Sequence, residues 1–169
     1  ALSAILVALE QGISIEKIKK GLSNFSITKG RLTIINKKDI TIIDDSYNAS
    51  SDSIISALKV LNNYNTRKVA ILGDVLETGK YAKEIHEKIG DEIYPNATFL
   101  IACGNDAKYY ISSAIKKGLD KKNAVFFKNY EDLLKEIDKY IKKGDTILVK
   151  ASHGILLDRV VEYLDNNYE

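Results

Sequence analysis

The residues best suited to chemistry gather in one stretch, residues 40–52, with the sequence Ile-Thr-Ile-Ile-Asp-Asp-Ser-Tyr-Asn-Ala-Ser-Ser-Asp. Its first residues are apolar and mostly β-branched, which is typical of a buried strand. Two adjacent carboxylates, Asp44 and Asp45, and a cluster of small polar side chains follow. In open α/β sheets, ligands bind in the crevice beyond the carboxyl ends of the strands. This polar loop is therefore the first candidate for a binding site.

The two carboxylates are expected to have different surroundings. Consecutive strand residues point to opposite faces of a sheet, so Asp44 and Asp45 should leave the strand in opposite directions. One of them can bond the backbone locally, while the other is free to accept hydrogen bonds from a ribose diol or to hold a cation. A loop and capping role for both is the alternative.

Three further polar loops follow apolar runs: residues 73–79 (Gly-Asp-Val-Leu-Glu-Thr-Gly), 104–106 (Gly-Asn-Asp) and 150–154 (Lys-Ala-Ser-His-Gly). If the preceding strands are parallel, all of these loops meet at one edge of the sheet. Lys150 ends the last apolar run, and Ser152 precedes the last predicted helix, whose N-terminus favours an anion. A surface lysine and an ordinary N-cap are the alternatives.

The remaining candidates carry weaker signals. We interpret Gly73 and Gly104 as residues that end strands. For His86, a packing role and a catalytic role are both open, and neither His86 nor His153 has the spacing of metal ligands. No metal site is predicted.

The bulk composition is that of a globular protein of 169 residues, with 45% hydrophobic and 28% charged residues. No apolar run reaches the roughly 20 residues of a membrane span, and no signal-peptide pattern is present. A net charge of +2 does not indicate nucleic-acid binding. Cys103 is the only cysteine, which excludes an internal disulfide, favours a buried thiol and fits a reducing cytoplasm.

Alternating apolar runs and helical patterns should position the polar loops. Strands are predicted at residues 31–36, 40–44, 68–72, 98–103, 124–127 and 146–150, and helices at 52–62, 81–93, 106–117, 131–142 and after 154. The first two strands form a hairpin. The later ones are rich in Val, Ile and Leu, which indicates a parallel sheet covered on both faces. The predicted fold is α/β: a doubly wound, mostly parallel, six-stranded, Rossmann-like sheet with one antiparallel strand from the N-terminal hairpin.

The first residues form a separate unit. Residues 1–22 are predicted to form two short helices, the first ending near Gly12 and the second capped by Ser14. A connector follows at residues 25–30, and we divide the chain into a helical segment, residues 1–28, and an α/β domain, residues 29–169. The chain has no Met and opens inside an apolar helical pattern, which indicates a piece of a longer protein.

Three ordered motifs resemble the C-terminal domain of the Mur ligase family. They are residues 44–49 (Asp-Asp-Ser-Tyr-Asn-Ala), 72–79 (Leu-Gly-Asp-Val-Leu-Glu-Thr-Gly) and 150–154. Gly30-Arg31 is similar too, and residues 1–28 look like the tail of the family's central ATP-binding domain. The motifs are most similar to those of the member that adds D-alanyl-D-alanine to UDP-N-acetylmuramoyl-tripeptide.

The resemblance implies an ATP-dependent ligase of peptidoglycan precursor synthesis. In that reaction ATP phosphorylates the tripeptide carboxylate, and the dipeptide amine attacks the acyl phosphate to give a peptide bond, ADP and phosphate. The chain has no G-x-x-x-x-G-K-[ST] loop and no G-x-G-x-x-G motif after a strand. By the resemblance, the N-terminal and central domains of the same polypeptide would hold most of the ATP, the Mg²⁺ and the nucleotide-sugar peptide. The chain alone is therefore expected to be inactive.

The resemblance also implies residue roles. The implied ATP-binding residues are Arg31 at the phosphates, Asp45 at the ribose, and Tyr47 and Asn48 near the adenine. The implied D-alanyl-D-alanine residues are Lys150, Ser152, Asp74 and Glu77. The physics agrees, because a guanidinium suits phosphate and a carboxylate suits a diol, while the dipeptide's carboxylate needs a cation.

Two motifs depart from the family pattern. Ser50-Ser51 stands where the family usually has Asn-Pro, and Ala151 and His153 stand where the last motif usually has Gly and Arg. Because the Arg is missing, a guanidinium contact to the dipeptide carboxylate is not implied for this chain, and the assignment to the family stands.

A second hypothesis comes from another class of protein. Asp44-Asp45, Asp74 and Lys150 also resemble the acidic pair, the phospho-acceptor and the lysine of response-regulator receivers. Against this, Ala151 stands where receivers have Pro, and Gly104 replaces their Ser or Thr. Phosphorylation of Asp74 by a small acyl phosphate would support it.

Overall fold

The computed structural model describes residues 2–25 and 28–169. The strands are β1 (Thr33–Asn36), β2 (Thr41–Asp44), β3 (Lys68–Gly73), β4 (Phe99–Cys103), β5 (Ala124–Phe127) and β6 (Thr146–Lys150). The α-helices are α1 (Leu2–Glu10), α2 (Ile15–Ser23), α3 (Ser51–Asn62), α4 (Ala82–Asn96), α5 (Lys108–Lys117), α6 (Tyr130–Glu136) and α7 (Asp158–Asn167). Short 3₁₀ segments are η1 (Gly79–Tyr81), η2 (Lys121–Asn123), η3 (Ile137–Lys139) and η4 (His153–Ile155).

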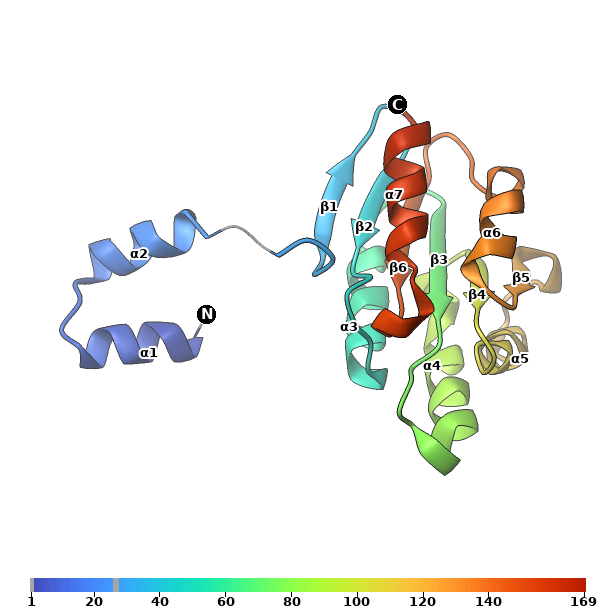
Figure 1. Cartoon of the computed structure of the whole chain (residues 1–169), viewed down its shortest axis with the longest axis horizontal. Helices are drawn as coiled ribbons and strands as arrows, with labels where there is room; N and C mark the ends of the chain where they lie inside the picture. Colours follow the sequence, from blue (N-terminus) through green and yellow to red (C-terminus); the bar gives the residue numbers. More distant parts are fainter. Residues whose placement is uncertain (1, 26–27) are drawn as a thin grey trace.

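The strands form one six-stranded sheet in the order β1-β2-β6-β3-β4-β5 (Figure 1). β1 pairs antiparallel with β2, and every other neighbouring pair is parallel. The predicted fold class is confirmed, including the single antiparallel strand. The order places β6, the last strand of the chain, between β2 and β3, and this brings its carboxyl end next to two earlier loops.

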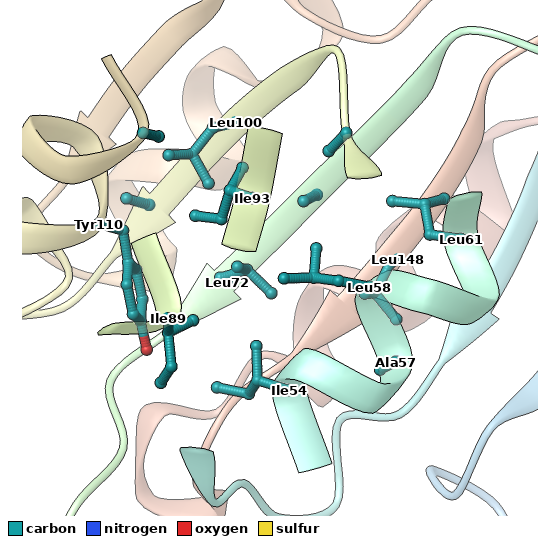
Figure 2. Close-up of a cluster of buried hydrophobic side chains, with 14 of the residues drawn as sticks. Ile54, Ala57, Leu58, Leu61, Leu72, Ile89, Ile93, Leu100, Tyr110 and Leu148 are labelled. Atoms are coloured by element: carbon teal, nitrogen blue, oxygen red, sulfur yellow. The ribbon is translucent and has the colours of Figure 1, made fainter. Parts of the chain in front are cut away.

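Alternation along the strands gives the sheet two apolar faces. Leu72 and Leu148 belong to a cluster with side chains of α3, α4 and α5. Ile71 and Val149, one position away, belong to a second cluster with side chains of α6 and α7. Figure 2 shows the first cluster, in which α3 contributes Ile54, Ala57, Leu58 and Leu61, α4 contributes Ile89 and Ile93, and α5 contributes Tyr110. Burial on both faces accounts for the near-continuous apolar composition of the strands.

Cys103 ends β4 inside the second cluster and is fully buried, as the sequence indicated. Burial, and next the nearby Asp74 carboxylate, raise the pKa of the Cys103 thiol to about 12. The thiol therefore stays protonated and contributes as a small apolar group.

The helix predicted at residues 131–142 is shorter in the structure. α6 ends at Glu136, and η3 continues only to Lys139. The Arg67 guanidinium donates to the carbonyl of Tyr140 at 3.1 Å, and the Asp145 carboxylate accepts the N–H of Lys142 at 2.8 Å. Arg67, far away in the sequence, and Asp145, three residues after Lys142, thus take backbone groups that a continuing helix would bond internally.

The two N-terminal helices stand apart from the sheet (Figure 1) and contribute no buried residue. Ser14 caps α2 by accepting the N–H of Lys17 at 3.5 Å, as predicted. An apolar groove of about 330 Å³ lies between the helices, lined among others by Ile5, Ala8, Ile18, Leu22 and Phe25. Residues 26 and 27 of the predicted connector lie outside the described residues. No described helix is long and apolar enough to cross a membrane.

Candidate functional site

The polar loops at the carboxyl ends of the strands contact one another, as expected for parallel strands. The N–H of Ser152, after β6, donates to the carbonyl of Asp74, after β3, at 3.0 Å. The Asp74 carboxylate accepts N–H groups of the loop after β4. Lys150, at the end of β6, pairs with Asp45, just after β2. The four predicted loops therefore form one polar edge.

Two of the clefts along this edge share a wall. The larger, about 620 Å³, is lined by Arg31, Asp45, Lys150 and the first turns of α3, and we name it the Arg31 cleft. The smaller, about 340 Å³, is lined by Leu76, Glu77, Ser152 and His153, and we name it the Ser152 cleft. Residues 47–49 line both. A ligand in one cleft would therefore lie close to a ligand in the other.

Asp44 and Asp45 point to opposite sides of the sheet, as predicted. The Asp44 carboxylate is buried on the α7 side and accepts both the N–H and the hydroxyl of Ser46, at 3.2 and 2.6 Å. Asp45 faces the α3 side and lines the Arg31 cleft. Asp44 bonds locally to Ser46, and Asp45 lines the Arg31 cleft, so the two carboxylates have different surroundings, as expected.

Asp45 already has two partners within the chain. Its Oδ1 accepts the N–H of Leu32 at 3.0 Å, and its Oδ2 lies 2.6 Å from the ammonium of Lys150. Lys150 is 3% exposed at its side chain and also donates to the carbonyl of Asn48 at 2.8 Å. The carboxylate is therefore fixed in orientation and its charge is balanced.

The structure separates Lys150 from the other residues expected at the dipeptide site. Lys150 lines the Arg31 cleft, whereas Ser152 and Glu77 line the Ser152 cleft. The reason is that β6 lies between β2 and β3. The side chain of Lys150, the last residue of β6, points toward Asp45 after β2. The chain then bends, so that Ser152 contacts the loop after β3.

Ser152 does not begin the last helix, in contrast to the expectation. α7 starts at Asp158, and only the three-residue η4 follows Ser152 directly. The Ser152 hydroxyl instead accepts the N–H of Leu76 at 2.9 Å. It holds the loop that carries Glu77, whose side chain is exposed in the Ser152 cleft.

Tyr47 forms the side-chain part of the shared wall. The Arg31 guanidinium carbon lies 4.3 Å from the centroid of the Tyr47 ring, a cation–π geometry. The His153 ring lies on Tyr47 as well, with centroids 5.9 Å apart. Tyr47 is 47% exposed, so a planar ligand can still reach it.

The Asp74 side chain itself does not line the Ser152 cleft. It is buried, and its oxygens accept the N–H groups of Asn105, Asp106 and Ala107 at 2.7, 3.1 and 2.7 Å. These N–H groups precede α5, so the carboxylate caps that helix from a distance. Its loop, through Leu76 and Glu77, does reach the cleft.

Gly73 and Gly104 do more than end strands, which the sequence did not reveal. A Cβ on Gly104, where φ is +136°, would lie 2.4 Å from the Asp74 carboxylate. A Cβ on Gly73 would lie 2.6 Å from the side chain of Ala151. Both glycines leave room for contacts between loops far apart in the sequence.

His86 has a packing role. Its ring is fully buried against Tyr110, with centroids 4.8 Å apart. Nε2 accepts the N–H of Val75 at 3.2 Å, so the ring proton lies on Nδ1 and is donated to the carbonyl of Ala82 at 2.7 Å. The ring thus joins the loop after β3 to α4, beneath the clefts.

Ser50 preserves the start of α3. The Ser50 hydroxyl accepts the N–H of Ser53 at 3.3 Å, and the Ser53 hydroxyl accepts the N–H of Ser50 at 2.9 Å. This reciprocal capping box replaces the family's Asn-Pro with another favourable N-cap. The departure therefore leaves the wall of the Arg31 cleft intact.

The fold is an α/β domain with polar loops and clefts beyond the carboxyl ends of its strands. The family model described as "Mur ligase, glutamate ligase domain" matches residues 30–153. This match covers most of the chain, so the chain belongs to the Mur ligase family.

Individual relatives agree with this assignment. The chain is 42% identical to the UDP-N-acetylmuramoyl-tripeptide–D-alanyl-D-alanine ligase of Buchnera aphidicola subsp. Baizongia pistaciae, over 99% of this chain and 36% of that protein. It is 32% identical to the enzyme of that name from Bacillus subtilis, over 97% of this chain and 36% of that protein. The chain thus spans about a third of the length of these relatives.

Solved structures show the same likeness. MurF from Acinetobacter baumannii superposes with a TM-score of 0.82 at 29% identity, covering 95% of this chain and 35% of that one. MurF ligase from Thermotoga maritima in complex with ADP gives a TM-score of 0.76 at 25% identity, covering 96% and 36%. The phospho-acceptor hypothesis is not supported, since the relatives are ligases and the Asp74 oxygens are taken by backbone N–H groups.

Proposed function

We propose that this chain is the C-terminal domain of an ATP-dependent ligase that adds D-alanyl-D-alanine to UDP-N-acetylmuramoyl-tripeptide through an acyl phosphate. The observation that carries the proposal is the pair of clefts that share residues 47–49. A ligase of this type must bring the incoming amine to a carboxylate that ATP has just phosphorylated. Two adjacent clefts of different chemistry supply that proximity.

The Arg31 cleft is the proposed nucleotide side. Arg31 offers a planar charged fork for phosphate, and Asp45 offers carboxylate oxygens for ribose hydroxyls. Tyr47 and Asn48 border the same cleft and are proposed to lie near the adenine. The solved Thermotoga maritima relative is a complex with ADP, which is consistent with ATP as the substrate.

The Ser152 cleft is the proposed dipeptide side. Exposed Glu77 suits the ammonium of D-alanyl-D-alanine, and His153 stands where the family motif has Arg. Ser152 is proposed to act by holding the Leu76–Glu77 segment in place, since its hydroxyl accepts the N–H of Leu76.

The preceding domains are proposed to supply the remaining groups. Among residues 2–25 and 28–169, no group of three or more His, Cys, Asp or Glu side chains could hold a metal ion. Mg²⁺, most contacts to the triphosphate and the nucleotide-sugar peptide are therefore assigned to the N-terminal and central domains. ATP as substrate and the lone buried thiol of Cys103 fit the cytoplasm as the location.

Residues 1–28 are proposed to belong to the preceding central domain and residues 29–169 to form the ligase C-terminal domain. The large apolar side chains of Leu2, Leu6 and Phe25 are 78%, 66% and 71% exposed. An apolar groove lies between α1 and α2. Surface of this kind is usually covered by protein, and the longer relatives have chain to cover it.

A domain boundary between residues 28 and 29 predicts that residues 29–169 fold without the helical segment, residues 1–28. Removing residues 1–28 should shift the urea midpoint of the α/β domain by less than the error of measurement, because α1 and α2 bury nothing against it. Leu6→Asp in the full-length protein should instead lower stability by about 2 kcal/mol, the value of one buried leucine. A large loss of stability on removing residues 1–28 would contradict the boundary.

The function is tested in the full-length protein that contains this chain. Phosphate release should require ATP, UDP-N-acetylmuramoyl-tripeptide and D-alanyl-D-alanine together. Asp45→Ala should raise the KM for ATP roughly ten- to a hundredfold, the loss of a charged hydrogen bond of about 1.5–3 kcal/mol. Asp91→Ala, on the exposed side of α4 and paired with Lys117, is the control. An unchanged KM for ATP in Asp45→Ala would remove Asp45 from the nucleotide site.

A further inference from the structure

Lys150 is a buried lysine whose charge is used inside the chain. Its side chain is 3% exposed, and its ammonium lies 2.6 Å from Asp45 Oδ2 and 2.8 Å from the Asn48 carbonyl oxygen. A buried ammonium is costly unless it is paired and hydrogen-bonded. Both partners line the Arg31 cleft, whereas neither Lys150 nor Asp45 lines the Ser152 cleft.

Sheet geometry brings Lys150 and Asp45 together. Val149 is in register with Asp44 on the adjacent parallel strand, so the following residues of the two strands are neighbours. Lys150 lies two positions after Leu148, and Asp45 two positions after Ile43, and both of these apolar residues belong to the α3 face. Period-two alternation therefore directs both charged side chains to the same side of the sheet.

The ion pair connects two segments that line the Arg31 cleft. Asp45 Oδ1 accepts the N–H of Leu32, which has a left-handed backbone (φ +52°) and directly follows Arg31. The ammonium also holds the Asn48 carbonyl, next to Tyr47. Lys150 thus fixes, through two contacts, the turn that presents Arg31 and the loop that presents Tyr47.

The pair leaves Asp45 able to bind a ligand. An ionised carboxylate has about four acceptor positions, and two are taken by Leu32 and Lys150, so roughly two remain for a pair of hydroxyls. Because Lys150 balances the charge of Asp45, Arg31 stays available for an anion in the same cleft. Without Lys150, the Asp45 carboxylate would be an unpaired anion in the same cleft as Arg31.

We propose that Lys150 is a positioning residue of the nucleotide cleft, which orients Asp45 for the ribose hydroxyls and keeps Arg31 free for the phosphates. This inference rests on the proposed function and deepens it. It replaces the expectation that Lys150 binds the carboxylate of the incoming dipeptide.

The test compares Lys150→Met, Asp45→Asn and the double variant in the full-length protein, with Lys116→Met on the exposed side of α5 as the matched control. ATP affinity is measured by calorimetry, which needs no turnover, and dipeptide KM is measured by phosphate release. Lys150→Met should weaken ATP binding at least about tenfold and change the dipeptide KM less than about twofold. If Lys150 only stabilised the fold, its loss would not weaken ATP binding while leaving the dipeptide KM nearly unchanged.

The double variant tests the coupling. The Lys150→Met and Asp45→Asn effects should not add, so the double variant should bind ATP within about threefold of the weaker single variant, instead of about a hundredfold below wild type. Lys150→Arg keeps the charge and should give an intermediate ATP affinity, at least about threefold weaker than wild type. If Lys150→Met does not fold, ATP affinity and dipeptide KM are measured on Lys150→Arg instead, and these two values decide between the outcomes.

Two results would overturn the inference. One is a raised dipeptide KM with unchanged ATP affinity in the Lys150 variants, which would place Lys150 at the dipeptide carboxylate. The other is additive loss of ATP affinity in the double variant. Failure of the proposed function gives a different result, because the wild-type protein would then not join the dipeptide at all while its ATP affinity would still be measurable.

Discussion

The Asp74 side chain joins the loop after β3 to the loop after β4. Asp74 accepts three N–H groups at the entrance of α5, and Gly104 leaves the space that its carboxylate fills. The Ser152 N–H bonds the carbonyl of the same Asp74. The position of the Ser152 cleft therefore depends on a glycine that does not line it.

Gly104→Ala should destabilise the chain by about 3 kcal/mol, since the new methyl group would displace the carboxylate and leave buried N–H groups unpaired, at about 1–3 kcal/mol each. Gly144→Ala is the control, because Gly144 also has a positive φ (+88°) but nothing within 4 Å of the added Cβ. That variant should cost only about 1 kcal/mol of backbone strain. Urea unfolding measures both, and equal losses would show that the Asp74 contact has no special weight.

At the residue scale, the sequence correctly predicted the features that depend on a single strand. The opposite directions of Asp44 and Asp45 follow from period-two alternation, and the structure confirms them. The partner of Lys150 depends on β6 lying beside β2, and the two residues are far apart in the chain. Nothing in the local pattern distinguishes a lysine that faces Asp45 from one that faces the Ser152 cleft.

At the scale of elements, the opposite end of the sheet is held by an ion pair between two strand entrances. Arg67, before β3, lies 2.6 Å from the carboxylate of Asp145, before β6, and the Asp145 side chain is 1% exposed. Arg67 also packs over the Phe99 ring, with its guanidinium carbon 4.7 Å from the centroid. The pair thus fastens β3, β6 and β4 at the end away from the clefts.

Arg67→Ala should cost about 3 kcal/mol or more, because removing one partner of a buried pair leaves an uncompensated charge. The loss should be large because Asp145 Oδ1 has no hydrogen-bond partner in the described structure and cannot compensate. Arg159→Ala is the control, since Arg159 pairs with Glu162 in solvent and should contribute less than about 1 kcal/mol. The measurement is the free energy of unfolding in urea; a loss no larger than that of Arg159→Ala would contradict the argument.

Arg67 also explains one element boundary that could not be predicted from the sequence. The limits of β5 and β6 match the sequence prediction, because apolar runs there are bounded by charged or small residues. The end of α6 could not be predicted, since its stretch has no Gly or Pro before Gly144. The end of α6 depends instead on Arg67, which is far away in the sequence and donates a hydrogen bond to the Tyr140 carbonyl.

At the scale of the whole molecule, the clefts supply only part of the groups that the proposed ligase reaction needs. Arg31 and Lys150 are the cations that line the Arg31 cleft among the described residues, and Lys150 is paired with Asp45. A triphosphate carries several negative charges, so one available guanidinium is not enough to hold it. Glycine-rich phosphate loops supply backbone N–H groups and a lysine for this purpose, and the sequence contains no such motif.

The isolated chain should therefore fold but hydrolyse no ATP and join no dipeptide. Under the proposed function, its groups would bind and orient a nucleotide and an amine, while the transferred phosphoryl group would need metal and cationic stabilisation from elsewhere. Phosphate release is measured with ATP alone and with both other substrates, using the full-length protein as the positive control. Asp45→Ala in the isolated chain identifies contaminants, because a contaminating ATPase is unaffected by that change. ATP turnover that the isolated chain shows and the Asp45→Ala chain lacks would mean that this domain carries phosphoryl-transfer groups of its own.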